Sequence, residues 1–113
     1  MSFWGKKKFI NSTPMAISVQ LWVRKGGDPG STKSIKNFSL NPHHGCMESY
    51  GDDANPFLDG ISINGVDQGE TIAEQQFVFQ RGNALDNGFN TNDTVTVRMI
   101  EQNFVLEFSN TWT

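Results

Sequence analysis

The sequence predicts an all-β fold, a single antiparallel β-sandwich of about six to eight short strands. Three observations lead to this expectation. Short stretches with alternating apolar and polar residues recur along the chain, and no stretch has the periodicity of a helix of useful length. Eleven glycines and eleven asparagines supply the residue types that tight turns prefer. Because 113 residues are enough for one hydrophobic core, residues 1–113 are expected to form one domain.

The clearest element is a strand over residues 15–24. Trp22 falls on the polar face of this strand, beside Gln20 and Arg24. Residues 26–31 then combine Gly, Asp, Pro and Ser, so the strand is expected to end in an exposed turn. The opposite, core-facing side has an apolar residue at every second position: Met15, Ile17, Val19, Leu21 and Val23.

The order of the first elements resembles immunoglobulin-like sandwiches in general architecture. The segment Asn11-Ser12-Thr13 precedes the long apolar strand, and a short strand over 35–40 then carries Phe38 and Leu40 inward and stops at Pro42. This resemblance covers the first 45 residues and lacks the cysteine and core tryptophan arrangement of that class. It implies two antiparallel sheets packed face to face.

The middle of the chain is less regular. Residues 41–60 form no clear pattern, and Asn64-Gly65 between apolar residues then predicts a hairpin turn. Residues 71–74 match a helix capping box, but the alternation over 77–80 follows so closely that we favour a strand, with a short helical turn as the alternative.

The last third combines a loop with a hairpin. Residues 80–93 form the longest stretch without a pattern, and loops of this length are more often functional than average. Alternation then returns over 94–99 and over 104–109, which predicts two paired strands. We expect their turn to use Asn103 at positive φ.

Composition excludes several classes of protein. With 36% hydrophobic residues, 19% charged residues and a net charge of −3, the chain is neither disordered nor a membrane protein. The single cysteine, Cys46, excludes a scaffold held by internal disulfides and favours a reducing compartment. Because no apolar segment follows the basic amino terminus, a cytoplasmic location is expected, with export by a leaderless route as the alternative.

Charge is unevenly distributed along the chain. Residues 1–36 carry seven basic groups and one acidic group, a net charge of +6, whereas residues 37–113 carry two arginines and eleven acidic groups, a net charge of −9. In the folded protein the two segments could interleave and neutralise each other. Alternatively, they could stay on separate faces and favour head-to-tail association of identical molecules.

One aromatic side chain suggests ligand binding. An exposed Trp22 would be a stacking platform for sugars or flat ligands, with amide and charged side chains supplying oriented hydrogen bonds. Alternatively, Trp22 could be covered by a loop, and Trp4 and Trp112 could pack together near the chain ends. The candidate ligand-binding residues are Trp22, Arg24, Tyr50, Asn87 and Asn90.

No cofactor is expected, and calcium is the alternative. Calcium takes six to eight oxygen ligands, and the acidic loops contain the required residue types, although turns also favour Asp and Asn and no EF-hand order is present. The candidate ligands are Asp52, Asp53, Asn55, Asp59, Asp86 and Asp93.

A further cluster comprises His43, His44 and Cys46. It would suit a thiol or metal-dependent enzyme, but one cysteine and two adjacent histidines do not match zinc-ligand spacing, and a surface loop with a half-buried thiol explains the cluster better. No catalytic residue is therefore assigned. The lysines at 6–8 are expected to protect an edge strand, and neither nucleic acid nor a membrane is expected as a partner.

These observations favour a non-catalytic binding or assembly module. It would recognise a protein partner or a carbohydrate through its polar loops or its aromatic sheet face. The alternative is a homo-oligomeric structural protein without a small ligand, and an enzyme at His43, His44 and Cys46 is a third hypothesis.

Overall fold

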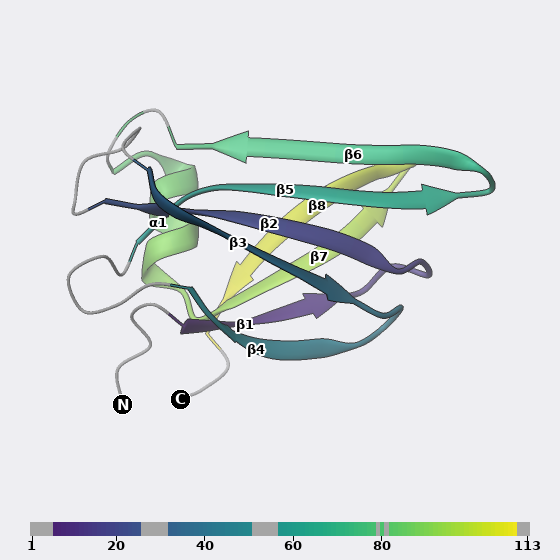
Figure 1. Cartoon of the computed structure of the whole chain (residues 1–113), viewed down its shortest axis with the longest axis horizontal. Helices are drawn as coiled ribbons and strands as arrows, with labels where there is room; N and C mark the ends of the chain where they lie inside the picture. Colours follow the sequence, from purple (N-terminus) through teal and green to yellow (C-terminus); the bar gives the residue numbers. More distant parts are fainter. Residues whose placement is uncertain (1–5, 26–31, 51–56, 79, 81, 111–113) are drawn as a thin grey trace.

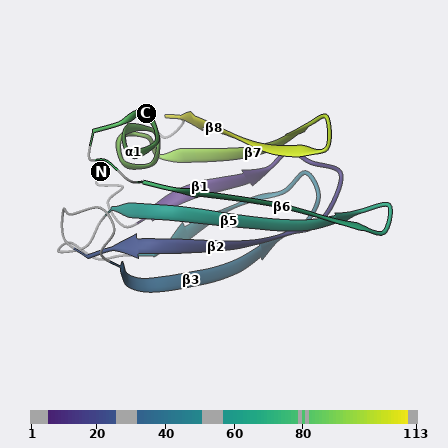
Figure 2. The ribbon, with the colours of Figure 1, turned by 90° about the horizontal axis from the view of Figure 1, so that it is seen from above.

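Two four-stranded sheets pack face to face (Figures 1 and 2). The computed structural model describes residues 6–25, 32–50, 57–78, 80 and 82–110. The β1 sheet has the order β4-β1-β7-β8 and consists of β1 (Lys6–Asn11), β4 (Gly45–Ser49), β7 (Thr94–Ile100) and β8 (Asn103–Ser109). The β2 sheet has the order β3-β2-β5-β6 and consists of β2 (Ile17–Arg24), β3 (Thr32–Leu40), β5 (Leu58–Asp67) and β6 (Glu70–Phe77). The two-sheet β class predicted from the sequence is confirmed.

One pair of strands departs from the antiparallel expectation. β1 and β7 run parallel, with Lys8 opposite Thr94 and Asn11 opposite Val97. Parallel neighbours cannot be joined by a tight hairpin, and here almost the whole chain separates the two strands. Local alternation therefore gives no sign of this pairing.

The hydrophobic core lies between the two sheets. Residues 17, 19, 21 and 23 of β2 point inward, as alternation predicted, and all four side chains are at most 2% exposed. The other sheet covers them with side chains such as Phe9, Val95 and Val97. Burial of each of these side chains stabilises the fold by about 1.5–3 kcal/mol relative to exposure.

The two predicted turn positions are wrong. Asn64 and Gly65 lie within β5, and the turn to β6 falls at Gln68 and Gly69, both of which have positive φ. Gly65 is needed for a different reason, because a Cβ there would lie 2.7 Å from the Met15 sulfur.

The turn between β7 and β8 is also displaced by one residue. Glu101 and Gln102 adopt positive φ, and Asn103 already belongs to β8. Two consecutive residues with positive φ are the requirement of a type I′ turn.

The strand favoured over residues 71–74 is confirmed, because these residues belong to β6.

Residues 80–93 are not only a loop. They contain the helix α1 (Ala84–Thr91), which lies at one end of the sandwich (Figures 1 and 2). The Asn83 side chain caps the helix by accepting a hydrogen bond from the Asp86 amide. Phe89 anchors it against the ring of Phe108 at 5.3 Å. Only Leu85 and Phe89 give its sequence an apolar side, so the pattern was too short to predict a helix.

The lysines at 6–8 do not lie on an edge strand as expected. β1 lies between β4 and β7, and the Lys7 side chain points inward. Its ammonium donates a 2.5 Å hydrogen bond to the Asn92 carbonyl at the end of α1.

In the described ranges, no helix has the length and apolar character needed to cross a membrane.

Candidate functional site: the outer face of the β2 sheet

Three rows of residues on the solvent-facing side of the β2 sheet contain no charged side chain. Alternation along β2 turns Ser18, Gln20 and Trp22 outward, and the register places each of them in a row across all four strands. We call these three rows the uncharged face. They are Ile35-Trp22-Gly60-Phe77, Asn37-Gln20-Ser62-Gln75 and Ser39-Ser18-Asn64-Ala73.

An aromatic pair forms one end of the uncharged face. The rings of Trp22 and Phe77 lie 4.9 Å apart at 69°, an edge-to-face contact. Gly60 lies between them on β5, and a Cβ on Gly60 would lie 2.4 Å from the Phe77 ring. The absence of a side chain at Gly60 therefore allows Phe77 to lie across the sheet toward Trp22. Ile35, on the other side of Trp22, is 50% exposed and extends this apolar end.

The rest of the uncharged face is polar and shallowly hollowed. A depression of about 440 Å³ includes Gln20 and Asn37 among its lining residues, and a second depression of about 370 Å³ extends toward Val66. Ser18 and Asn64 line both, so the two depressions adjoin. Within the described part of the chain, the side chains of Gln20, Asn37 and Asn64 have no hydrogen-bond partner in the protein. Their donors and acceptors are free to bind a ligand.

The outer side of the β1 sheet differs in charge. Arg98 and Glu107 form an exposed ion pair there, with 2.6 Å between Nε and Oε1. The register places Lys6 and Lys8 on the same side of that sheet as this pair. The described outer positions of the β1 sheet are thus charged where the three rows of the β2 sheet are not, which makes the uncharged face the better candidate for a dedicated surface.

Of the predicted ligand-binding residues, Trp22 lies on the uncharged face and Arg24 does not. The register of β2 shifts on both sides of Val23, and this irregularity turns Arg24 inward. The Arg24 side chain is 2% exposed, so the expectation that it lies beside Trp22 is wrong.

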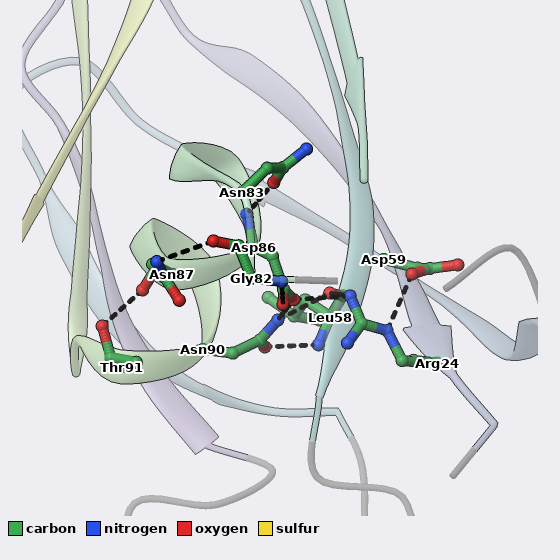
Figure 3. A network of polar contacts seen from close by, with 9 residues as sticks. All are labelled: Arg24, Leu58, Asp59, Gly82, Asn83, Asp86, Asn87, Asn90 and Thr91. Atoms are coloured by element: carbon green, nitrogen blue, oxygen red, sulfur yellow. Dashed lines mark hydrogen bonds and ion pairs between the residues drawn. The ribbon is translucent and has the colours of Figure 1, made fainter. Parts of the chain in front are cut away.

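Arg24 is held in a buried polar cluster near the start of α1 (Figure 3). Its guanidinium donates from Nε to Asp59 at 2.8 Å and from Nη2 to Asp86 at 2.7 Å. Burial alone would raise the pKa of Asp86, but hydrogen bonds from the Gly82 amide, Arg24 and Asn90, together with the arginine charge, lower it below its usual value. The cluster connects β2, β5 and α1.

The other three predicted ligand-binding residues also lie away from the uncharged face. The Asn90 amide binds the backbone of Leu58 and the Asp86 carboxylate. The Asn87 side chain is exposed and donates to the Gly82 carbonyl. Tyr50 is buried, which raises the pKa of its hydroxyl, and that hydroxyl has no hydrogen-bond partner among the described residues.

The described candidate calcium ligands do not all lie together. Asp59 and Asp86 meet around Arg24, so a guanidinium occupies the space between them. Asp93 is buried elsewhere and accepts a hydrogen bond from Thr94. The described ranges contain no group of three or more His, Cys, Asp and Glu side chains placed to hold a metal ion. Asp52, Asp53 and Asn55 lie outside the described residues.

The histidine and cysteine cluster does not converge on one point. His43 has a φ of 58° in the turn between β3 and β4, and both His43 and His44 are exposed. Cys46 packs against the core from β4. Burial and the neighbouring Glu48 carboxylate both raise the pKa of the Cys46 thiol, which disfavours the nucleophilic thiolate.

The sequence predicted Trp22 as a binding residue but did not predict the amide side chains beside it. These are Gln20, Asn37, Asn64 and Gln75. The available signal was the lack of charge at alternate positions of four separate strands, and the register was needed to show that these positions meet. Comparison of the chain with models of known protein families, with curated proteins and with solved structures finds no significant match.

Proposed function

We propose that this protein is a non-catalytic binding module that holds a neutral carbohydrate on the uncharged face. The observation that carries the proposal is the combination, on one sheet surface, of an aromatic pair with amide side chains that no protein group engages. Carbohydrate rings present apolar C–H faces and a rim of hydroxyl groups. An aromatic ring suits the first feature, and amide side chains, which both donate and accept hydrogen bonds, suit the second.

The absence of charge supports a neutral ligand. Recognition of phosphate, sulfate or carboxylate groups generally uses arginine or lysine, because charge-assisted hydrogen bonds are the strongest available. None of the twelve residues in the three rows is basic or acidic. The loop residues first considered for binding, such as Asn90, are engaged in the protein's own hydrogen bonds. The sheet face is therefore favoured over the loops.

A glycan screen with matched variants tests the proposal. The wild-type protein is expected to retain neutral glycans, and Trp22→Ala is expected to weaken binding by about tenfold or more, because it removes the aromatic surface on which a sugar ring would stack. Trp22→Phe should lose less because it keeps an aromatic ring. Gln20→Ala and Asn37→Ala should each weaken binding, whereas Thr96→Ala on the outer side of the β1 sheet should leave it unchanged.

Salt dependence adds an independent criterion. Binding to an uncharged face should change little between low and high NaCl, because there is no charge pair to screen. Selective retention of anionic glycans, or equal loss of binding in the Thr96→Ala control and in Trp22→Ala, would contradict the proposal.

The general immunoglobulin-like architecture expected from the sequence is also kept as a proposal. Two packed sheets support it, and within the β1 sheet, β1 pairs with β7 in parallel.

A further inference from the structure

The β2 sheet ends in two strands that carry opposite charges. β3 and β6 are its edge strands (Figure 1), and among the described residues each leaves one row of backbone hydrogen-bonding groups without a strand partner. β3 contains Lys33 and Lys36 and no acidic residue, whereas β6 contains Glu70 and Glu74 and no basic residue. The two strands are nearly equal in length, at nine and eight residues.

One charged residue on each edge strand lies on the core side of the sheet. Lys36 is the register partner of Leu21, and Glu74 is the partner of Ile63, so both occupy inward positions. Both side chains are half-buried, and neither forms an ion pair within the described part of the chain. Because their charged ends must reach water, we expect both side chains to extend sideways past the edge of the sheet. This is where the backbone of an added strand would lie.

We propose that a second copy of this chain docks head to tail on this sheet, with β6 of one copy pairing with β3 of the next. The strand directions fit this arrangement. Every neighbour in the order β3-β2-β5-β6 is antiparallel, so β6 runs opposite to β3. A copy placed beside the first in the same orientation therefore continues an antiparallel sheet.

Charge selects this contact over its alternatives. Pairing of β3 with β3, or of β6 with β6, would bring lysine to lysine or glutamate to glutamate, whereas pairing of β6 with β3 brings opposite charges together. The edges of the β1 sheet lack this complementarity, because β4 carries Glu48 and β8 carries Glu107 and neither strand carries a basic residue. The contact is heterologous, so repetition produces a ring or a filament. It does not depend on the proposed function.

Charge exchange between the edges tests this inference. By light scattering coupled to size-exclusion chromatography, the wild-type mass should rise with protein concentration and fall in high NaCl. Lys36→Glu places a carboxylate at the core-side position of both edges, and Glu74→Lys places an ammonium group at both, so each variant alone should be monomeric. An equimolar mixture of the two variants should associate again, and the double variant Lys36→Glu/Glu74→Lys should associate with itself.

Matched charge changes away from the edges serve as controls. Lys6→Glu and Glu101→Lys alter the net charge equally but lie on the inner strand β1 and in the β7–β8 turn, so they should assemble as the wild type does. Circular dichroism would verify that each variant is folded. A wild-type protein that is monomeric at all concentrations would overturn the inference. So would single variants that still assemble, or monomeric variants whose mixture fails to associate.

Discussion

Lys7 is a charged side chain inside the sandwich. Its side chain is 2% exposed and its ammonium donates to the Asn92 carbonyl. Burial lowers the pKa of Lys7 from 10.5 to about 8, while the nearby Asp93 carboxylate acts in the opposite direction. Because the unfolded chain keeps the ordinary pKa, folding is coupled to the loss of this proton between the two values.

The sign of this coupling gives a prediction for alkaline pH. Between about pH 8 and 10.5 the unfolded chain holds more protons than the folded chain, so the free energy of unfolding should increase with pH, by at most about 1.4 kcal/mol per pH unit. Urea denaturation across the lower part of this window measures the slope. Replacement Lys7→Met removes the titrating group and should flatten the profile, and an equally steep profile in that variant would refute the assignment.

Arg24 is the second buried charge, and it is balanced on two sides. Its removal would leave the carboxylates of Asp59 and Asp86 facing each other in a buried site. Loss of one partner of a buried ion pair costs about 3–5 kcal/mol, because the remaining charge is uncompensated. We therefore expect Arg24→Leu to lower the free energy of unfolding by this amount.

A matched control is available on the protein surface. Arg98 also contacts a carboxylate, but the Arg98 and Glu107 side chains are both about half exposed. Exposed pairs contribute less than about 1 kcal/mol, so Arg98→Leu should change the urea midpoint only slightly. Equal losses in Arg24→Leu and Arg98→Leu would show that burial of the Arg24 cluster is not what stabilises it.

The β7–β8 turn contains two consecutive residues with positive φ. Glu101 and Gln102 adopt φ values of 50° and 65°, which side chains other than Gly and Asn adopt only at a cost. Replacement of this pair by Asn-Gly should raise the free energy of unfolding by about 1 kcal/mol, measured by thermal melting. Gly69→Ala, at φ 82° in the β5–β6 turn, is the converse change and should lower it. A less stable Asn-Gly variant would contradict this account.

The same turns show how far a single sequence predicts elements. Alternation located β2, β7 and β8 because burial of every second residue is a local property of a strand. The turn positions were predicted wrongly. Asn64-Gly65 has turn chemistry, but Gly65 is required by the close approach of the Met15 side chain. The helix α1 was missed because its stability depends on Phe89 meeting Phe108, a contact between distant segments.

At the scale of the molecule, the division of charge along the sequence has a spatial counterpart. Part of the basic segment forms β3 and part of the acidic segment forms β6, so the two signs lie at opposite edges of the same sheet. Interleaving occurs as well, since Lys7 lies close to Asp93 and Arg24 between two carboxylates. The sequence left both outcomes open, and strand order was needed to find each.

The candidate site could likewise be predicted from the sequence only in part. Trp22 could be predicted as a solvent-facing aromatic residue because alternation assigns its side of the strand. The amide side chains of the uncharged face could not be predicted as a group. Gln20, Asn37, Asn64 and Gln75 come from four strands and lie together only because of the strand register. Arg24 was misplaced because a register shift interrupts the alternation just before it.

Nuclear magnetic resonance of the side-chain amides tests whether the uncharged face is the carbohydrate-binding site. In a titration with a neutral oligosaccharide selected by the glycan screen, the amide signals of Gln20, Asn37, Asn64 and Gln75 and the indole signal of Trp22 should shift together. The amide signals of Asn87, Asn90 and Asn103, which lie away from the uncharged face, should stay in place. Shifts confined to Asn87, Asn90 or Asn103, or no shift of any side-chain signal at saturating oligosaccharide, would contradict the assignment of the uncharged face as the binding site.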